Sequence, residues 1–316
     1  SMRLLSHTEM GLSSIQSRLR MERESLDPFA ILAVLGVTDA TAATPVSGGQ
    51  DTAIWRVDRP GGRYALRVFA PGEERKCARE VATMRAAAAG GIPIPMVHAD
   101  GSWHGRPALL LSWCPGRTLF AALQAHPLRV WPLGVMCGQM QARLHTIPLR
   151  EAPPYAPDQW LNWGGTLDAR LRERLLAVAR RPLVLCHFDY HPLNVMTDGE
   201  RVTAVLDWPN GLPGDPRADL ARTIVLMQFV RPSLRPHEEA LVRCFLRAWW
   251  HGYHRGRGSL GEMAPFYAWA GDVTVRDQEQ KIGQPGIALQ SADLDPLRRW
   301  TDQWKRRAGI SSTVRE

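Results

Sequence analysis

Short runs of apolar and β-branched residues, interrupted by glycine and proline, characterise the chain between residues 53 and 111. Runs of this length, bounded by turn residues, are typical of β-strands. The pattern predicts four strands, at 53–57, 64–69, 96–99 and 108–111. Because glycine-containing turns at 59–62 and 100–105 separate two pairs of these runs, we expect antiparallel hairpins.

Helical periodicity prevails in much of the rest of the chain. Helix-like segments occur between 9 and 35, where Asp27 and Pro28 form a start signal and Gly36 a stop signal. Further helices are predicted at 73–85, 130–147 and 168–180, and over most of the chain after 219, whereas the tryptophan-rich stretch 158–165 is expected to be a loop. The pattern predicts an α+β protein, with an antiparallel sheet and a few helices first and a mainly helical region second.

Two more strand-like runs, at 183–186 and 202–206, interrupt the helical region, and an Asp-Gly hairpin signal lies between them. Polar residues follow both runs. Asp189 and Asn194 lie in the loop after the first run, and Asp207 comes directly after the second. Side chains at strand ends and in adjoining loops can converge on one ligand, so these three residues form a candidate site.

The three residues have the chemistry that phosphoryl transfer from a magnesium nucleotide requires. A carboxylate orients the attacking hydroxyl and accepts its proton, and oxygen ligands hold Mg²⁺ on the phosphates. Asp189 suits the first role. Asn194 and Asp207 suit the second, because Mg²⁺ usually takes only one or two carboxylates from a protein. An Asp and an Asn five positions apart are also common in ordinary turns, so this spacing alone leaves both interpretations open.

The order His-x-Asp-x-x-x-x-Asn, followed by an apolar strand ending in Asp, resembles the catalytic segment of the aminoglycoside phosphotransferase and choline kinase group. That group has the protein kinase-like fold. It usually has glycine where this chain has Phe188. A second stretch, Gly-Asp-Pro-Arg-Ala-Asp-Leu-Ala at 214–221, resembles the family's Gly-Asp-Pro segment and the helix that it opens.

The resemblance implies a protein kinase-like two-lobed fold. Residues 1–112 would form the nucleotide-binding lobe with an N-terminal helical extension, and residues 113–316 the catalytic and acceptor-binding lobe. It also implies that Asp189 is the catalytic base and that Asn194 and Asp207 are the magnesium ligands.

Other polar residues of the two segments have supporting roles in this interpretation. His187 is expected to pack and hydrogen-bond, which organises the loop. Asp215 and Asp219 are expected to brace the catalytic loop or to cap the following helix rather than touch the substrate. The role of His191 stays open.

The resemblance also implies a nucleotide-binding region in the first lobe. Ser47, Gly48, Gly49 and Thr52 are the candidate phosphate-binding residues, because glycines let backbone N–H groups approach phosphate oxygens. A Ser-Gly-Gly sequence is, by itself, equally typical of a simple turn.

Arg67, in the predicted strand 64–69, is the candidate cation for the phosphates. Protein kinases have a lysine at this place, but the three lysines of this chain lie elsewhere. Many relatives resemble the chain in having Leu-Arg-x-Phe there, and a guanidinium binds phosphate oxygens in a bidentate fork. Glu80, in the predicted helix 73–85, is the expected partner that aims Arg67. The alternative is that Glu80 pairs with surface arginines.

Ser112 and Cys114 are the candidate adenine-binding positions. The predicted strand 108–111 runs directly into Ser112, Trp113 and Cys114, a segment that resembles the hinge of the family. The implied contacts are made by backbone groups. Trp113 either packs against the protein or stacks on the base.

Composition argues against several other classes of protein. No apolar run approaches about 20 residues, so we expect no membrane span. The net charge of the 316 residues is +8, but the basic residues are spread along the chain and mixed with acids, which argues against nucleic acid as a partner. Five cysteines occur singly, a pattern that favours reduced thiols in a cytoplasmic protein over a zinc site or disulfides.

We therefore expect a phosphotransferase that uses Mg²⁺ and moves the γ-phosphoryl group of ATP or GTP to a hydroxyl of a small molecule. One candidate acceptor is an aminoglycoside or another amino alcohol, and homoserine, choline or a sugar-type metabolite is the alternative. The near balance of acidic and basic residues over 151–316 weakens the aminoglycoside option. Aromatic residues of this half form either a cation–π cage for an amine or ordinary core packing: Trp160, Trp163, Trp249, Trp250, Tyr253, Tyr267 and Trp269.

Three other functions fit the sequence less well. A catalytically silent kinase-like binding protein would have lost the base or a metal ligand, and here all three residues are retained. A protein kinase would carry Asp-Phe-Gly and Ala-Pro-Glu segments around an activation loop, and a serine hydrolase a Gly-x-Ser-x-Gly elbow. The sequence leaves the oligomeric state open.

Overall fold

The computed structural model describes residues 26–46, 52–150, 154–156, 158–179, 182–230, 235–258, 260–284 and 289–310. These residues divide into two compact units. The first consists mainly of the described residues between 26 and 82 and of 94–114. The second consists of 83–93 and most of the described chain after 115.

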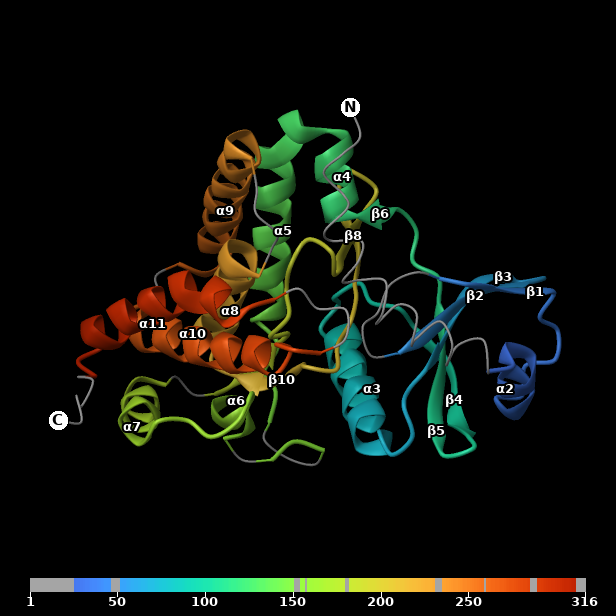
Figure 1. Ribbon diagram of the computed structural model, residues 1–316. Helices are drawn as coiled ribbons and strands as arrows, with labels where there is room; N and C mark the ends of the chain where they lie inside the picture. The colour runs from blue at the N-terminus through green and yellow to red at the C-terminus, as the bar shows by residue number, and fades with distance from the viewer. Residues whose placement is uncertain are drawn as a thin grey trace. The chain divides into compact units, whose positions relative to one another are not determined.

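The first unit is built on a five-stranded antiparallel sheet with the order β1-β2-β3-β5-β4 (Figure 1). Its strands are β1 (Ala42–Pro45), β2 (Ala53–Arg59), β3 (Gly62–Val68), β4 (Val97–Trp103) and β5 (Arg106–Ser112). The last four confirm the predicted strands. The predicted hairpin loop at 100–105 is shorter than expected, because His104 and Gly105 have φ angles of 48° and 72° and form a two-residue turn.

Two helices belong wholly or partly to this unit. Helix α2 (Pro28–Val34) begins at the predicted place, because the Asp27 carboxylate accepts hydrogen bonds from the N–H groups of Phe29 and Ala30. Its Ile31 packs in the same core as strand residues Trp55 and Leu66. Helix α3 (Glu74–Ala89) confirms the predicted helix at 73–85 and extends it. The helix-like residues 9–25 lie outside the described residues.

The second unit is mainly helical (Figure 1). Its helices after α3 are α4 (Leu119–Ala125), α5 (Val130–Leu144), α6 (Gln159–Asn162), α7 (Ala169–Val178), α8 (Pro216–Phe229), α9 (Pro236–Arg257), α10 (Ala264–Glu279) and α11 (Asp295–Arg307). The predicted helices at 130–147 and 168–180 are confirmed. The prediction of a loop over 158–165 is wrong in part, because burial of Trp160 and Leu161 supports the one-turn helix α6.

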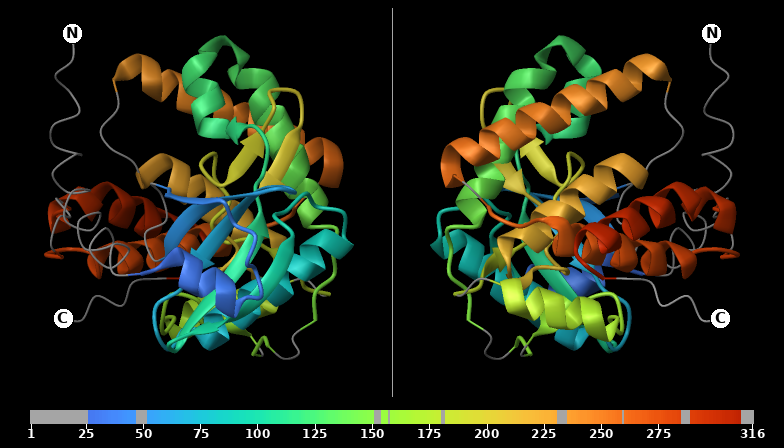
Figure 2. Two further views of the ribbon diagram at one scale, coloured as in Figure 1. Left: turned by 90° about the vertical axis from the view of Figure 1, so that its right-hand side faces the viewer. Right: turned by 90° about the vertical axis from the view of Figure 1, so that its left-hand side faces the viewer.

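Glycines allow α5 and α9 to pack closely along their lengths, and the two helices lie side by side in Figures 1 and 2. A Cβ atom at Gly138 would collide with the carbonyl oxygen of Trp249. A Cβ at Gly252 would collide in the same way with Val135. Only glycine permits this backbone approach, and the contact brings Gln141 on α5 close to Trp249 on α9.

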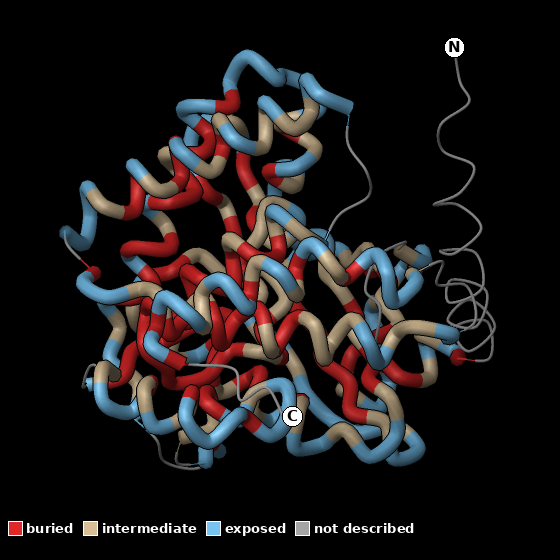
Figure 3. Tube along the Cα trace, turned by 60° about the vertical axis from the view of Figure 1, so that its left-hand side comes forward, coloured by how far each residue is buried: buried red, intermediate tan, exposed pale blue. Residues whose placement is uncertain are grey.

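Helix α8 differs from the outer helices because it is buried on nearly all sides. On α11, by contrast, Leu297 and Thr301 are buried whereas Arg299 and Arg306 are exposed. Figure 3 shows helices with one buried and one exposed face as alternating red and pale blue stretches, around an interior that is mostly red. Polar side chains on α8 must therefore find partners inside the protein.

Short strands complete the second unit. They are β6 (Arg117–Thr118), β7 (Val184–Cys186), β8 (Val195–Thr197), β9 (Val202–Val205) and β10 (Leu212–Gly214), in sheets with the orders β6-β8-β9 and β10-β7. The predicted strands at 183–186 and 202–206 are present. They do not pair with each other, because β8 takes the place beside β9 and β7 pairs with β10. The strands that were not predicted, β6, β8 and β10, have only two or three residues and depend on their pairing partners.

Candidate active site

The strand pairing brings the ends of β8 and β9 together. Val195 lies opposite Val205, and the N–H of Leu206 donates to the carbonyl of Asn194 at 2.8 Å. Asn194 therefore precedes one strand at the place where Asp207 follows the other. The φ angle of Asp207 is 62°, a left-handed conformation that a short polar side chain tolerates better than most.

Asp189 lies in the loop between β7 and β8 and contacts Asn194 directly. The Asn194 Nδ2 group donates to the Asp189 carbonyl at 3.0 Å and to Asp189 Oδ2 at 3.1 Å. His191 Nε2 lies 3.5 Å from the other carboxylate oxygen, Oδ1. The side chain of Asp189 is 22% exposed, so it is accessible to a ligand although most of it is enclosed.

Asp189 is ionised at neutral pH. Burial by itself would raise the pKa of this carboxyl, but its interaction with His191 outweighs burial and, with smaller effects from His187 and Arg222, lowers the pKa to about 2. A carboxylate with so low a pKa is a weak base in the resting protein. Such a carboxylate can accept a hydrogen bond from a bound hydroxyl and fix its direction.

The His187 ring connects the loop that carries Asp189 with the end of β9 through hydrogen bonds to the backbone of both. Its Nε2–H donates to the carbonyl of Leu206 at 2.9 Å, and its Nδ1 accepts the N–H of Asp189 at 3.3 Å. These two contacts define a neutral tautomer. Burial lowers the pKa of His187, in agreement with a neutral ring. His187 thus organises the loop, as expected, and makes no contact that would assign it chemistry.

Phe188, the departure from the usual glycine, is fully buried and has a φ angle of 58°. Its ring lies in the hydrophobic core of the second unit. Its backbone N–H donates to Asp219 Oδ1 at 2.5 Å. The residue before Asp189 thus combines a left-handed backbone with a buried ring and a hydrogen bond to Asp219.

Asp219 is the centre of a buried hydrogen-bond network that braces the loop carrying Asp189. Its Oδ2 accepts from His145 Nε2 at 2.8 Å and from Gln141 Nε2 at 3.0 Å. Behind them, Tyr253 Oη lies 2.8 Å from His145 Nδ1, and Trp249 Nε1 donates to Gln141 at 2.9 Å. Burial alone would raise the pKa of Asp219, but the hydrogen bonds from His145 and Gln141 lower it.

Gln141 in this network was not singled out in the sequence, and Tyr253 and Trp249 were considered only for a cation–π cage or for core packing. A Gln or a Tyr in an amphipathic helix gives no signal for a hydrogen-bond partner far along the chain. The expected bracing role of Asp219 is present. Asp215 caps α8 by accepting from the N–H of Arg217 at 2.9 Å, which is the other role expected.

The side chains at the ends of β8 and β9 fit a magnesium ion. Nδ2 of Asn194 is engaged with Asp189, so the oxygen Oδ1 is the atom that this amide offers to a cation. Asp207 offers a carboxylate at the neighbouring strand end. One amide oxygen and one carboxylate form the hard, incomplete ligand set that Mg²⁺ takes from proteins when phosphate supplies the remaining oxygens.

The first unit contains the expected contact between Arg67 and Glu80. Arg67 Nη1 lies 2.5 Å from Glu80 Oε1, and Arg67 Nε donates to Thr52 Oγ1 at 3.1 Å. Glu80 is 1% exposed and Arg67 12%, which contradicts the alternative of a surface pair. Phosphate binding by Arg67 stays a prediction. Ser47, Gly48 and Gly49 lie outside the described residues.

Ser112 and Cys114 lie at the end of β5, also in the first unit. Ser112 contacts Met96 twice, since its N–H donates to the Met96 carbonyl at 2.9 Å and its Oγ accepts the Met96 N–H at 2.8 Å. The Cys114 thiol is 4.0 Å from the Ser112 carbonyl. These contacts hold the backbone after β5 in place. Adenine binding there stays a prediction.

The aromatic residues of the second unit are mostly core. Trp160, Trp249, Trp269 and Tyr253 are at most 1% exposed, so the packing interpretation holds for these four.

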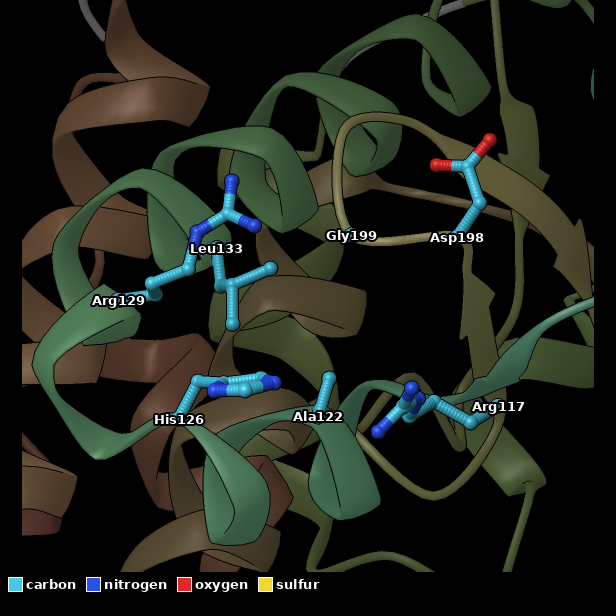
Figure 4. Close-up of a pocket in the computed structure, with 7 residues that line it drawn as sticks. All are labelled: Arg117, Ala122, His126, Arg129, Leu133, Asp198 and Gly199. Carbon is cyan, nitrogen blue, oxygen red and sulfur yellow. The ribbon is translucent and has the colours of Figure 1, made fainter.

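A surface hollow on the same unit is lined by none of the predicted site residues (Figure 4). Its lining is Arg117, Ala122, His126, Arg129, Leu133, Asp198 and Gly199. No helix among the described residues combines the length and apolar character that a bilayer span needs.

Comparison with known proteins identifies the family. A model of the phosphotransferase enzyme family matches residues 42–263, which confirms the resemblance seen in the catalytic segment. Acyl-CoA dehydrogenase family member 10 of Mus musculus is 29% identical over 170 residues. That match covers 45% of this chain and only 16% of the mouse protein.

Solved phosphotransferases share the fold. Aminoglycoside phosphotransferase APH(4)-Ia, in a thermostable form with AMP-PNP and hygromycin B, has a TM-score of 0.62 at 16% identity, over 90% of this chain and 100% of that one. Spectinomycin phosphotransferase APH(9)-Ia, with ADP and spectinomycin, has a TM-score of 0.54 at 14% identity, over 88% and 92%. Macrolide 2′-phosphotransferase MphH from Brachybacterium faecium has a TM-score of 0.50 at 18% identity, over 85% and 98%. The predicted fold class, α+β and protein kinase-like, is confirmed.

Proposed function

The chain belongs to the phosphotransferase enzyme family, and from this premise we propose that it moves the γ-phosphoryl group of ATP or GTP to a hydroxyl group of a small molecule. Asp189 would act as the base, and Asn194 and Asp207 would hold Mg²⁺. The observation that carries the proposal is the contact of Asn194 with the Asp189 carboxylate, beside the strand end that bears Asp207.

In the proposed reaction, the acceptor hydroxyl donates a hydrogen bond to the ionised Asp189. Its oxygen attacks the γ-phosphorus, the bond between that phosphorus and the β–γ bridging oxygen breaks, and the nucleoside diphosphate leaves. Because the pKa of Asp189 is about 2, the proton moves to its carboxylate only as the new oxygen–phosphorus bond forms and the hydroxyl becomes acidic. Bound Mg²⁺ would supply neutralisation of the phosphate charge.

The remaining predicted residues would bind the nucleotide. In this proposal residues 1–112 form the nucleotide-binding lobe and residues 113–316 the catalytic and acceptor-binding lobe. Arg67 would contact phosphate oxygens, and Glu80 supports this by fixing one edge of its guanidinium. Thr52 and the Ser-Gly-Gly segment at 47–49 would complete the phosphate site.

Adenine or guanine would be read by the backbone at Ser112 and Cys114. We further propose a cytoplasmic location, with neither nucleic acid nor membrane as a partner. All five cysteines are free thiols, which supports a reducing compartment.

For the acceptor, the proposal keeps two classes. Solved proteins of the same fold were crystallised with hygromycin B and with spectinomycin, which favours an aminoglycoside or another amino alcohol. The balance of charge over 151–316 favours a less cationic acceptor, such as homoserine, choline or a sugar. A silent binding protein is the remaining alternative, and the intact set of Asp189, Asn194 and Asp207 speaks against it.

A screen for ADP or GDP release over aminoglycosides, amino alcohols and sugars, with and without EDTA, tests the proposal. We expect at least one acceptor to stimulate magnesium-dependent release. Asp189→Asn should lower kcat by about 10²- to 10⁴-fold while nucleotide binding persists. Asp207→Asn should abolish the dependence on magnesium together with the activity.

Asp302→Asn, which changes an exposed aspartate on α11, is the matched control and should keep wild-type turnover. Wild-type turnover by Asp189→Asn on the best acceptor would refute the assigned mechanism. No stimulation by any acceptor, together with no binding of a magnesium nucleotide, would favour the silent binding protein.

A further inference from the structure

Phe188 occupies a backbone conformation that its residue type disfavours. Its φ angle is 58°, and in the left-handed region a Cβ atom crowds the following carbonyl oxygen. Glycine avoids this crowding, and Phe188 stands where the family usually has glycine. The conformation precedes the catalytic aspartate directly, so another part of the molecule must stabilise it.

Aromatic packing holds the Phe188 ring. Trp163 stacks on it with ring centroids 5.9 Å apart and planes inclined by 21°. Trp269 meets it edge to face at 5.7 Å and 64°. Gly214 makes room on a further side, because a Cβ there would lie 2.8 Å from the Phe188 Cζ atom. The ring is 0% exposed, so a change of the Phe188 backbone would have to displace these neighbours.

Trp163 is itself held by a buried cation. The Cζ atom of Arg222, on α8, lies 4.7 Å from the centroid of the Trp163 ring. Arg222 is 3% exposed, and its Nη1 donates to Thr274 Oγ1 on α10, which in turn donates to the Ala270 carbonyl at 2.7 Å. Two central helices therefore fix the guanidinium against the indole.

The placement of Arg222 carries an energetic cost that packing alone does not require. Its Nε–H is buried and makes no hydrogen bond with the described residues. Burial also lowers the pKa of Arg222, which means that the protein disfavours the charge it encloses. A hydrophobic side chain of similar length would fill the same space without this cost, so a functional reason for the arginine is expected.

We propose that Arg222 and Trp163 are positioning residues for the catalytic aspartate. The stack of Arg222 on Trp163 and of Trp163 on Phe188 holds the Phe188 backbone in its left-handed conformation. Rotation of that residue into the right-handed region would turn the next peptide and swing the Asp189 carboxylate away from Asn194. The inference rests on the proposed function, because it explains how this chain orients the proposed base without the usual glycine.

The chain provides a matched control for the stack. Arg307 lies over Trp304 with its Cζ atom 4.6 Å from the ring centroid, the same arrangement on the outer helix α11. Trp304 is half-buried like Trp163, and its ring packs on Tyr267 rather than on the catalytic loop. Substitutions in the two pairs remove the same type of cation–π contact, although Arg307 is exposed and Arg222 is buried, and only one pair reaches Phe188.

The test compares Trp163→Leu and Arg222→Met with Trp304→Leu and Arg307→Met. Hydrolysis of MgATP, with water as the probe acceptor, gives kcat and KM, and hydrogen exchange of the peptide 187–194 reports loop order without activity. We expect Trp163→Leu and Arg222→Met to lower kcat about 10- to 100-fold, with KM for MgATP within about twofold of wild type. Amide exchange of the loop should rise at least about fivefold.

Arg222→Lys retains a cation that can lie over the indole, so it should recover most of the turnover that Arg222→Met loses. The two control variants should stay within about twofold of wild type in both measurements. If Trp163→Leu and Arg222→Met match their controls in loop exchange and kcat, the inference is overturned. A rise in KM with unchanged kcat would also overturn it, because that result indicates ground-state binding.

Phe188→Gly tests the proposed route of the effect. Glycine adopts the left-handed conformation without steric cost, so Trp163→Leu should lower kcat much less in this background than in wild type. If Trp163→Leu lowers kcat by the same factor in the Phe188→Gly background as in wild type, the inference is overturned. Should Phe188→Gly not fold because of the space it leaves, loop exchange in Trp163→Leu and Arg222→Met decides the question alone.

The result also separates this inference from the proposed function. Wild-type turnover by Asp189→Asn would refute the mechanism itself. Loss of turnover in Asp189→Asn, combined with wild-type behaviour of Trp163→Leu, would refute only the positioning role of the stack.

Discussion

Arg67 in the first unit and Asp189 in the second both depend on a buried carboxylate, but their supports lie at different distances along the chain. Arg67 is held by Glu80, 13 residues away, and by Thr52, 15 residues away. The loop that carries Asp189 is held at Phe188 by Asp219, 31 residues away, and Asp219 is held by His145, 74 residues away.

This difference determines what a substitution would disturb. The Arg67 pair joins one strand to the next helix, so its loss affects the direction of one guanidinium. The Asp219 network joins α5, α8 and α9 to the loop that carries Asp189, so its loss affects both the packing of the helical unit and the direction of Asp189. Substitutions in the Asp219 network should therefore lower stability and activity together. Substitutions in the Arg67–Glu80 pair should lower activity with little loss of stability.

Asp219→Ala should have the largest effect. It leaves the Phe188 N–H and the His145 ring without their buried acceptor, and removing one partner from such a network costs about 3–5 kcal/mol. We expect a comparable loss in the free energy of unfolding, measured in urea, together with a strong fall in kcat. Asp302→Ala on α11 is the exposed control. An Asp219→Ala protein of wild-type stability would show that the network does not support the second unit.

Glu80→Gln should have a smaller and more selective effect. The amide keeps the shape of Glu80 but removes the charge that fixes Arg67, so we expect affinity for MgATP to fall about tenfold, or ~1.4 kcal/mol. Calorimetric titration with a non-hydrolysable nucleotide measures this change. Glu74→Gln, at an exposed position in the first turn of the same helix, should bind as wild type. Equal binding by both variants would contradict the assigned role of Arg67.

The pH dependence provides a third comparison. Asp189 has a pKa of about 2, below its ordinary value of ~3.9, so its ionised form stabilises the protein above about pH 4. That contribution is lost as the pH falls through about 2. The ratio of kcat for wild type and Asp189→Asn should therefore stay constant between about pH 5 and 9. A ratio that decreases as the pH is lowered from about 9 to 5 would show that Asp189 is protonated in this range. It would then be a stronger base than its surroundings indicate.

The smallest effect is expected at the proposed hinge. Burial raises the pKa of the Cys114 thiol to about 11, so its alkylation should be slow at neutral pH and accelerate up to about pH 11. MgATP should slow this reaction if the nucleotide lies against Cys114. Cys244, half-buried on α9, should react at the same rate with and without MgATP. Equal protection of both thiols would indicate a global effect rather than a nucleotide at the hinge.

Local signals predicted much of the framework. Asp27 and Pro28 marked the start of α2, and short apolar runs between turn residues marked four of the five strands in the first sheet, because caps, turns and strands depend on neighbouring residues. The contact between Arg67 and Glu80 was expected from the family resemblance, which implied a cation on this strand and a carboxylate on the next helix. The pairing of β7 with β10 and of β8 with β9 could not, because strands of three or four residues are selected by their partners.

The sequence by itself determined which residues are available for chemistry: Asp189 stands in the loop after one strand, and Asn194 and Asp207 flank the next two strands, in the order that the proposed magnesium-nucleotide site needs. Tertiary structure decided how they are held. A polar residue in a helix shows no preference for a partner until packing buries it, and burial then makes an unpaired group costly. Close contact between α5 and α9, and burial of most of α8, therefore brought Gln141, His145 and Tyr253 into the network around Asp219 that holds the loop before Asp189.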